Sequence, residues 1–286
     1  MNINIADGID AYLITKAKNS TRDYGHFHPS AWDGCHRKTA YQYYEAKGLL
    51  KTDTKSVKIR PVLERIFDVG HYAHARYRDY LYSYAPNCFM GRWRCPNHLA
   101  HKTPMIYGLD SKLGCKRVEK CECGFTGLVY EEVGFYDEKT GFGGHVDAIL
   151  DLQFWPLNLH PEDKLPDDER YCVVDFKTMH PMMFKKLESP KPEHLTQIQV
   201  YLYLSGLRYG KFLYEDKADQ MIKEFLVEKD EQTIAVKVEE AIKLKYILEH
   251  PNKQGKRVLP TRGYDSRGST ECLDCKFREH CWKGVS

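Results

Sequence analysis

The central part of the chain predicts strands, because apolar runs of strand length alternate there with polar turns. Three runs follow one another at 127–136, 144–155 and 171–178, and two more lie at 209–215 and 222–228. The turn sequence DEKTG separates the first two runs, and a long polar loop separates the second from the third. The pattern therefore predicts that this part of the chain forms a sheet.

Helical periodicity is found on both sides of these strands. A long amphipathic helix is predicted at 61–84, with Leu63, Ile66, Phe67 and Gly70 on its apolar face. The position of this helix before the strands makes it the first element of the predicted core.

Two more helices complete the pattern. One follows the third strand and ends near Gly206, and another is predicted at 232–250. An order of helix, three strands, helix and strand implies an α/β fold, in which a mixed central sheet is flanked by helices.

Composition adds limits rather than a function. A chain of 286 residues can form one large domain or a domain with insertions, and a net charge of +3 permits nucleic-acid binding without requiring it. Without an apolar stretch for a signal peptide or a membrane span, we expect a cytoplasmic protein with no membrane partner. Its ten cysteines are then better explained as metal ligands than as disulfides.

Two predicted strands carry the chemistry. Asp147 lies in one and Asp175 in the next, and Lys177 follows the second aspartate by two positions. Strand residues two apart point to the same face, so Asp175 and Lys177 project together, and Asp147 can join them from a neighbouring strand. Two carboxylates can hold a hard divalent cation, and an ammonium can steady an oxyanion or position a water. These three residues are the minimum set for metal-assisted phosphodiester hydrolysis. The alternative is that they are two aspartates at strand ends and a surface lysine, without a catalytic role.

The segment 86–126 has little periodicity and contains two short cysteine motifs. A tetrahedral zinc site can be built from two such short motifs, each of which closes a tight turn and supplies two ligands. The first choice of ligands is Cys95, His98, Cys121 and Cys123, and Cys115 is an alternative because C-x-C is tighter than the usual C-x-x-C. We predict a zinc-ribbon-like insertion; a loop with free thiols is the alternative.

The basic C-terminal segment carries three further cysteines, Cys272, Cys275 and Cys281. Three thiols leave a tetrahedral or cubane site one ligand short, and Cys35 is an available fourth. Four thiolates satisfy either zinc or an iron–sulfur cluster, and the spacing alone does not separate the two.

Together these motifs resemble the RecB-like branch of the PD-(D/E)XK nucleases, and within it the CRISPR-associated iron–sulfur exonucleases, whose relatives also occur in phages. The resemblance covers about Ser30 to Cys281, apart from the suspected zinc insertion. It rests on four motifs in the family's order, which are Gly70-x-x-x-His74, Asp147 in GGHVDAI, Asp175-Phe176-Lys177 and Gln197-x-x-x-Tyr201. The third reads D-x-K where many relatives have E-x-K.

The resemblance implies a fold and a division of the chain. The fold is a restriction-endonuclease-like core (αβββαβ) with the zinc-ribbon-like insertion and an iron–sulfur clasp that joins the N- and C-terminal segments. We expect an N-terminal helical region at 1–85, the insertion at 86–126, the nuclease core at 127–250 and the iron–sulfur segment at 251–286.

The resemblance also implies roles for residues. Mg²⁺ or Mn²⁺ is expected on His74, Asp147, Asp175 and the backbone carbonyl of Phe176, with Glu131 or Glu132 as an outer contact. Lys177 is the catalytic lysine, and Gln197 and Tyr201, one helical turn apart, adjoin the site. A 4Fe–4S cluster is expected on Cys35, Cys272, Cys275 and Cys281. Basic residues that can follow phosphates are Lys185, Lys186, Lys191, Arg257, Arg262 and Arg267.

The expected activity is that of a metal-dependent DNA exonuclease acting on single-stranded ends, in recombination, repair or spacer processing. The alternative is a non-catalytic nucleic-acid-binding subunit of a recombination or CRISPR adaptation complex. A zinc-ribbon transcription factor is a third reading, and it leaves the core motifs without a role.

Overall fold

The computed structural model describes residues 5–18, 23–51, 60–97, 121, 123–126, 129–156 and 165–283. The chain divides into two compact units, which we describe separately. The sheet unit comprises 28–32 and 73–243, and the terminal unit comprises 1–27, 33–72 and 244–286. The predicted catalytic residues all fall in the sheet unit, and the predicted cluster cysteines all fall in the terminal unit. The four-part division expected from the sequence stays a prediction.

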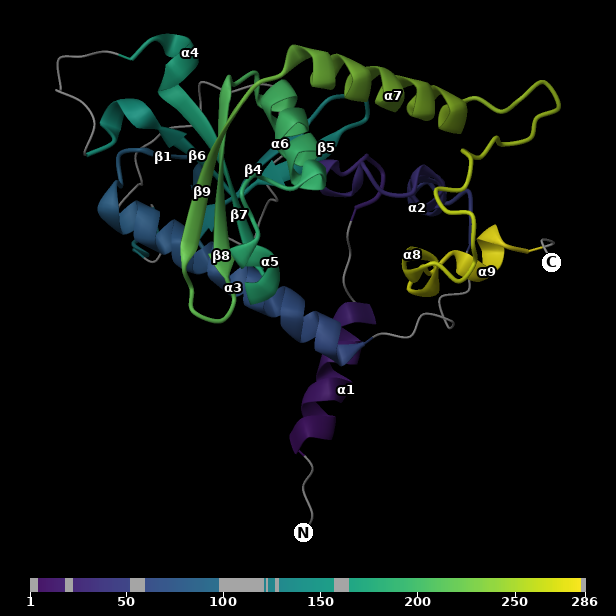
Figure 1. The fold of residues 1–286 in the computed structure, drawn as a ribbon, viewed down its shortest axis with the longest axis horizontal. Helices are drawn as coiled ribbons and strands as arrows, with labels where there is room; N and C mark the ends of the chain where they lie inside the picture. The colour runs from purple at the N-terminus through teal and green to yellow at the C-terminus, as the bar shows by residue number, and fades with distance from the viewer. Residues whose placement is uncertain are drawn as a thin grey trace. The chain divides into compact units, whose positions relative to one another are not determined.

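A five-stranded mixed sheet forms the core of the sheet unit (Figure 1). Its strands, in spatial order, are β1 (Phe89–Met90), β6 (Ala148–Asp151), β7 (Tyr171–Met179), β8 (Tyr209–Asp216) and β9 (Ile222–Glu228). β7 and β8 run parallel, and the other neighbours run antiparallel. A parallel pair needs a crossover connection, and here it contains the helix α6 (Pro192–Ser205).

Helices contribute to both faces of this sheet. The helices of this part of the chain are α3 (Pro61–Tyr84), α4 (Asp167–Arg170), α5 (Pro181–Lys185), α6 and α7 (Glu231–Glu249), with a short 3-10 turn at Pro29–Ala31. α3 and α7 each contribute residues to both units.

The alternation of side chains along β7 determines which helix covers which face. Val174 and Phe176 pack with Tyr77 of α3 in one apolar cluster. Lys177 points to the opposite face, where its ammonium donates to Gln197 of α6 over 3.0 Å. The central sheet is therefore flanked by helices, which confirms that part of the predicted fold.

The apolar face predicted for α3 is buried only in the C-terminal part of the helix. Ile66, Ala73 and Tyr77 lie on one face at helical spacing, but Ile66 and Phe67 are exposed whereas Ala73 and Tyr77 are buried. The buried positions belong to the sheet unit, and Ile66 and Phe67 belong to the terminal unit.

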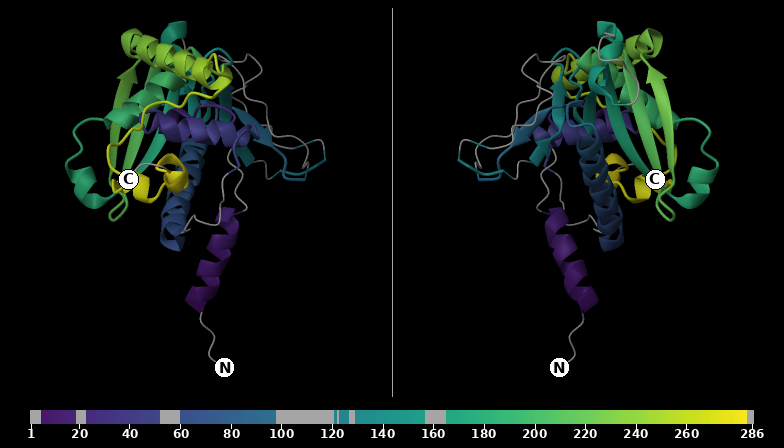
Figure 2. Two further views of the ribbon diagram at one scale, coloured as in Figure 1. Left: turned by 90° about the vertical axis from the view of Figure 1, so that its right-hand side faces the viewer. Right: turned by 90° about the vertical axis from the view of Figure 1, so that its left-hand side faces the viewer.

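The run predicted as one strand at 127–136 is interrupted. It forms β3 (Val129–Glu131) and β4 (Val133–Tyr136), with Glu132 between them. β3 pairs with β2 (Arg92–Arg94) in a separate two-stranded sheet, and β4 pairs with β5 (Figure 2). The backbone thus changes partner strand at Glu132.

The run predicted at 144–155 is interrupted as well. It forms β5 (Gly143–Val146) and β6, with Asp147 in a bend between them, and it ends in a 3-10 turn at Leu152–Phe154. β5 pairs with β4, whereas β6 pairs with β7, so this bend also joins two sheets.

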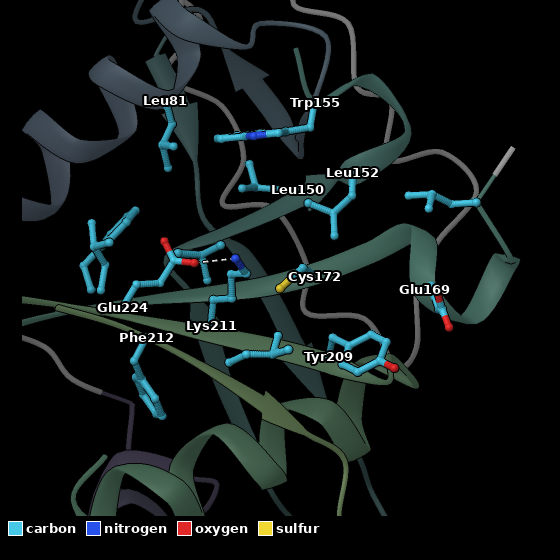
Figure 3. A pocket seen from close by; sticks show the side chains of 15 residues that line it. Leu81, Leu150, Leu152, Trp155, Glu169, Cys172, Tyr209, Lys211, Phe212 and Glu224 are labelled. Atoms are coloured by element: carbon cyan, nitrogen blue, oxygen red, sulfur yellow. Dashed lines mark hydrogen bonds and ion pairs between the residues drawn. The ribbon is translucent and has the colours of Figure 1, made fainter. Parts of the chain in front are cut away.

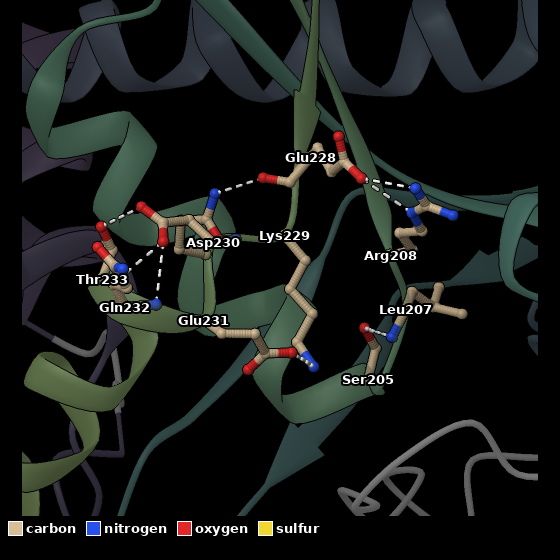
Figure 4. A network of polar contacts seen from close by, with 10 residues as sticks. Ser205, Leu207, Arg208, Glu228, Lys229, Asp230, Glu231, Gln232 and Thr233 are labelled. Atoms are coloured by element: carbon tan, nitrogen blue, oxygen red, sulfur yellow. Dashed lines mark hydrogen bonds and ion pairs between the residues drawn. The ribbon is translucent and has the colours of Figure 1, made fainter.

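Polar contacts fix the corner between β9 and α7 (Figure 4). The side-chain amide of Gln199 on α6 donates to the carbonyl of Glu228 over 2.8 Å and accepts from the N–H of Asp230 over 2.9 Å. Asp230 in turn caps α7, since its carboxylate accepts from the N–H and the hydroxyl of Thr233. α6 is therefore tied to this corner.

The terminal unit combines segments from the two ends of the chain. Its short helices are α1 (Ile5–Lys18), α2 (His36–Ala46), α8 (Thr270–Leu273) and α9 (Arg278–Cys281). The rings of Tyr41 and Phe277 lie 5.3 Å apart, and Lys276 forms an ion pair with Glu45. The N- and C-terminal segments thus pack together, as the predicted clasp requires.

Within the described residues, no helix combines the length and the apolarity that a bilayer span requires.

Candidate functional site

Asp175 and Lys177 form an ion pair on the face of β7 that α6 covers. The Lys177 ammonium lies 2.6 Å from Oδ1 of Asp175 and also donates to Gln197. The Asp175 side chain is 4% exposed, and this burial raises the pKa of its carboxyl, while the charge of Lys177 opposes the rise. The side-by-side placement expected for residues two apart in a strand is realised.

Asp147 reaches the pair from the bend between β5 and β6. Its Oδ2 accepts from the backbone N–H of Phe176 over 2.7 Å, which fixes the bend against β7. Its Oδ1 lies 3.0 Å from Nδ1 of His74. Asp147 is therefore held against β7, where its charge raises the pKa of Asp175, and α3 supplies the histidine.

His74 lies between acids. Burial lowers the pKa of its imidazole, but the hydrogen bond to Asp147 and the charges of Asp147 and Asp175 outweigh burial, so the pKa is raised. The histidine one turn earlier, His71, has a largely exposed side chain. The structure thus places His74, not His71, at the site.

Glu132 is the acid that joins this set. One ligand atom each from His74, Glu132 and Asp147 all lie within 4.8 Å of one another. The sequence left Glu131 and Glu132 as alternatives, because the choice depends on the strand break after β3. Arg78 of α3 forms an ion pair with Glu132, a partner that the sequence analysis did not identify.

Gln197 and Tyr201 close the site from α6. Burial raises the pKa of the Tyr201 phenol, and a hydrogen bond with Gln197 opposes the rise. A methyl group added at Gly144 of β5 would lie 2.9 Å from the Tyr201 hydroxyl, so this glycine allows the close approach of strand and ring.

A second histidine, His194, lies one turn before Gln197 and was not among the predicted site residues. Its Nδ1 is 2.7 Å from the Tyr214 hydroxyl. Burial, together with the charges of Lys177 and Lys191, lowers the pKa of His194 to about 3. The ring is therefore neutral and adds no positive charge to the site.

These donors fit a hard divalent cation. Carboxylate oxygens and an imidazole are ordinary ligands for such ions. Among the described residues, His74, Glu132 and Asp147 form a group whose ligand atoms lie within 4.8 Å of one another, and Asp175 is not part of that group. Asp175 is buried, and the Lys177 ammonium, 2.6 Å from its Oδ1, is the partner that the structure gives this oxygen. The carbonyl of Phe176 as a further ligand stays a prediction.

The predicted zinc ligands are described in part. The sulfurs of Cys95, Cys121 and Cys123 lie within 4.8 Å of one another. His98 and the alternative Cys115 lie outside the described residues.

The four cysteines predicted for the iron–sulfur cluster gather in the terminal unit. Burial raises the pKa of the Cys275 thiol, and the neighbouring Cys35 and Cys272 raise it further. The C-terminal segment packs closely on Cys35, because a methyl group at Gly263 would lie 3.3 Å from its sulfur. The backbone carbonyl of Cys281 accepts from Arg262 over 3.0 Å.

The predicted basic residues differ in their surroundings. Lys185 and Lys186 are exposed on and after α5. Arg262 contacts Cys281 and the ring of Trp282, and Arg267 forms an ion pair with Glu279. The two arginines therefore stabilise the C-terminal segment, which leaves the lysines as the better candidates for phosphate contacts.

A pocket of about 620 Å³ lies on the α3 side of the sheet (Figure 3). Its walls are mainly apolar, with Leu81, Trp155 and Leu226 among them, and its Lys211 is paired with Glu224. Asp175 and Lys177 do not line it. Its apolar walls do not suit a phosphodiester, so we do not assign the nucleic-acid site to it.

No family model and no curated protein matches the chain. Among solved structures, the crystal structure of SSO0001 aligns with a TM-score of 0.44 and 15% identity, over 99% of this chain and 98% of that chain. An alkaline exonuclease, LHK-Exo from Laribacter hongkongensis, aligns with a TM-score of 0.38 and 16% identity, over 79% and 91%. LHK-Exo in complex with dAMP aligns with a TM-score of 0.38 and 15% identity, over 79% and 89%. These scores are too low to establish a common fold, so the function has to be argued from the residues of this chain.

Proposed function

We propose that this chain is a metal-dependent DNA nuclease of the PD-(D/E)XK type. The observation that carries the proposal is the convergence of His74, Asp147 and the Asp175–Lys177 pair in one compact unit. A protein that only binds nucleic acid needs positively charged side chains for the phosphates. Buried acidic side chains around a histidine would not contribute to such binding.

The acids and His74 would hold Mg²⁺ or Mn²⁺, with Glu132 as a further ligand or an outer contact. Ion pairs join the same groups in the structure, His74 to Asp147 and Lys177 to Asp175. When bound, a divalent ion supplies positive charge to the scissile phosphate and lowers the pKa of water.

Lys177 would act on the reacting groups directly. Its ammonium is held from two sides, by Asp175 of the same strand and by the side-chain oxygen of Gln197 on α6. From there Lys177 can orient the attacking water or stabilise the charge that develops on the phosphate. Gln197 and Tyr201 are positioning residues in this account.

The substrate proposed is single-stranded DNA with a free end, processed in recombination, repair or spacer acquisition. Lys185, Lys186 and Lys191 would contact its phosphates, because they follow β7 directly along the chain.

A 4Fe–4S cluster on Cys35, Cys272, Cys275 and Cys281 belongs to the same proposal. It is supported by the packing of α2 against the C-terminal segment and by the closeness of Cys35, Cys272 and Cys275. Each thiolate of a cubane binds a different iron, so the cluster would join the N- and C-terminal segments. Its role in this proposal is structural. Anaerobically purified protein should be brown, and a colourless protein that contains no iron would refute the cluster.

The nuclease proposal is tested with Asp175→Ala and Lys177→Ala. Both variants should abolish Mg²⁺-dependent degradation of a labelled oligonucleotide, and circular dichroism should show an intact fold. Lys243→Ala, at an exposed lysine of α7 that has no role in this proposal, is the matched control and should cleave like wild type. If both site variants cleave like wild type, the active-site assignment is wrong. Metal-independent DNA binding by wild type without cleavage would favour a non-catalytic subunit.

A further inference from the structure

Three cysteines converge beyond the small β2–β3 sheet, away from the proposed catalytic residues. Cys95 directly follows β2, and Cys121 and Cys123 precede β3. Their sulfurs all lie within 4.8 Å of one another, and those of Cys95 and Cys123 are 3.6 Å apart. The nuclease chemistry gives these thiols no role.

The sulfur–sulfur distance excludes a disulfide and matches a zinc site; a hydrogen bond between two free thiols has the same length. A disulfide bond is about 2.05 Å long, far shorter than the distance observed. Four sulfurs at about 2.3 Å from a tetrahedral zinc lie about 3.8 Å from one another. The observed 3.6 Å is close to this edge length. A cubane would hold its thiolates farther apart, because each one binds a different iron.

The backbone around the thiols has the form of a metal knuckle. The N–H of Cys121 donates to the carbonyl of Phe125 over 2.8 Å, and the N–H of Gly124 donates to the carbonyl of Cys121 over 2.8 Å. Gly124 has a φ of 89°, which favours glycine in this tight turn.

The β2–β3 sheet connects this cluster to the core. Tyr130 of β3 donates its hydroxyl to the carbonyl of Met90 over 2.9 Å, and its ring packs on Phe89 at 4.7 Å. Gly91 leaves room for that ring, since a methyl group there would lie 2.4 Å from it. β3 then leads directly into Glu132, which lies beside His74 and Asp147.

We propose that Cys95, Cys121 and Cys123 bind a structural Zn²⁺ ion that closes the outer end of the β2–β3 sheet. By holding β2 and β3 together, the ion fixes the strand end from which Glu132 enters the catalytic site; only this last consequence rests on the proposed nuclease function.

The test is a metal analysis of the full chain, purified anaerobically. Wild type should contain one equivalent of zinc, and Cys121→Ser and Cys95→Ser should each contain less than about a tenth of that. Cys172→Ala, a buried cysteine outside both clusters, is the matched control and should retain its zinc. Cys275→Ser should lose iron and keep zinc, so failure of the iron–sulfur proposal and failure of this one give different results.

A second measurement covers the case in which a serine variant does not fold. Wild type grown or refolded with Co²⁺ should show the intense visible and near-ultraviolet bands of tetrahedral thiolate cobalt, and one equivalent of Zn²⁺ should remove them. A full equivalent of zinc in Cys121→Ser, or wild type that binds neither zinc nor cobalt with thiolate bands, would overturn the proposal.

Discussion

The ion pair between Lys177 and Asp175 predicts a loss of stability that depends on pH. Lys177→Met keeps most of the side-chain volume and removes the charge that lies 2.6 Å from Asp175. The two side chains are 19% and 4% exposed, so solvent screens the pair little. Removing one partner of a buried pair costs about 3–5 kcal/mol, and we expect that loss in the free energy of unfolding at pH 8 with EDTA present.

The direction of the pH dependence follows from the pKa of Asp175. Burial raises this pKa, and Lys177 opposes the rise, so the substitution raises it further. A group whose pKa is higher in the folded state than in the unfolded state loses stability as the pH rises through the folded-state pKa. The difference between variant and wild type should therefore shrink to less than about 1 kcal/mol at pH 4.5, where Asp175 is protonated in both folded proteins.

Urea unfolding followed by tryptophan fluorescence measures both values. Asp175→Asn removes the buried charge, so Asp175→Asn/Lys177→Met should unfold within about 1 kcal/mol of Asp175→Asn alone at pH 8. The exposed Lys186→Met should change stability by less than about 0.5 kcal/mol at either pH. The reasoning is refuted if Lys177→Met loses the same free energy of unfolding at both pH values. It is also refuted if the double variant is as much less stable than Asp175→Asn as Lys177→Met is less stable than wild type.

Three further predictions address the site. Glu132→Gln should raise the Mg²⁺ concentration for half-maximal cleavage by about tenfold, as loss of an outer metal contact does, whereas Glu131→Gln should leave it unchanged in the same titration. Gly144→Ala should destabilise the protein by about 1–3 kcal/mol and slow cleavage, since the new methyl group would lie 2.9 Å from the Tyr201 hydroxyl; urea unfolding and single-turnover rates measure the two effects. Mn²⁺ must displace a proton from Asp175, whose pKa burial raises, and from His74, whose pKa the neighbouring acids raise, so its affinity should rise with pH in calorimetric titrations, and Asp175→Asn should remove the aspartate part of that rise and leave the histidine part.

Local rules predicted the part of the site that lies within single elements. Asp175 and Lys177 share a face because strand side chains alternate, and Gln197 and Tyr201 share a face because they lie one helical turn apart. Whether two residues share a face of one strand or one helix can be predicted without knowing which other elements pack against it. The mixed sheet followed from the order of strands and helices for the same reason.

Tertiary contacts decided what the sequence could not. Glu132 enters the site because the backbone changes partner strand there, and no local signal separates it from Glu131. Similarly, Ile66 and Ala73 share one face of α3, yet Ile66 is exposed and Ala73 is buried, because only the residues from Ala73 onward belong to the sheet unit. The ion pair between Arg78 and Glu132 depends on both the strand break and the helix, because Glu132 lies at the break and Arg78 lies on α3.

The central claim is that His74, Asp147, Asp175 and Lys177 form one metal-dependent hydrolytic site. The most direct test is the rate at which Asp147→Asn releases nucleotides from end-labelled single-stranded DNA, compared with wild type, at saturating Mg²⁺ and with EDTA. The account predicts cleavage by wild type with Mg²⁺ only, and a rate at least about 10²-fold lower in Asp147→Asn. Wild type that cleaves equally in EDTA, or Asp147→Asn that cleaves at the wild-type rate, would contradict it.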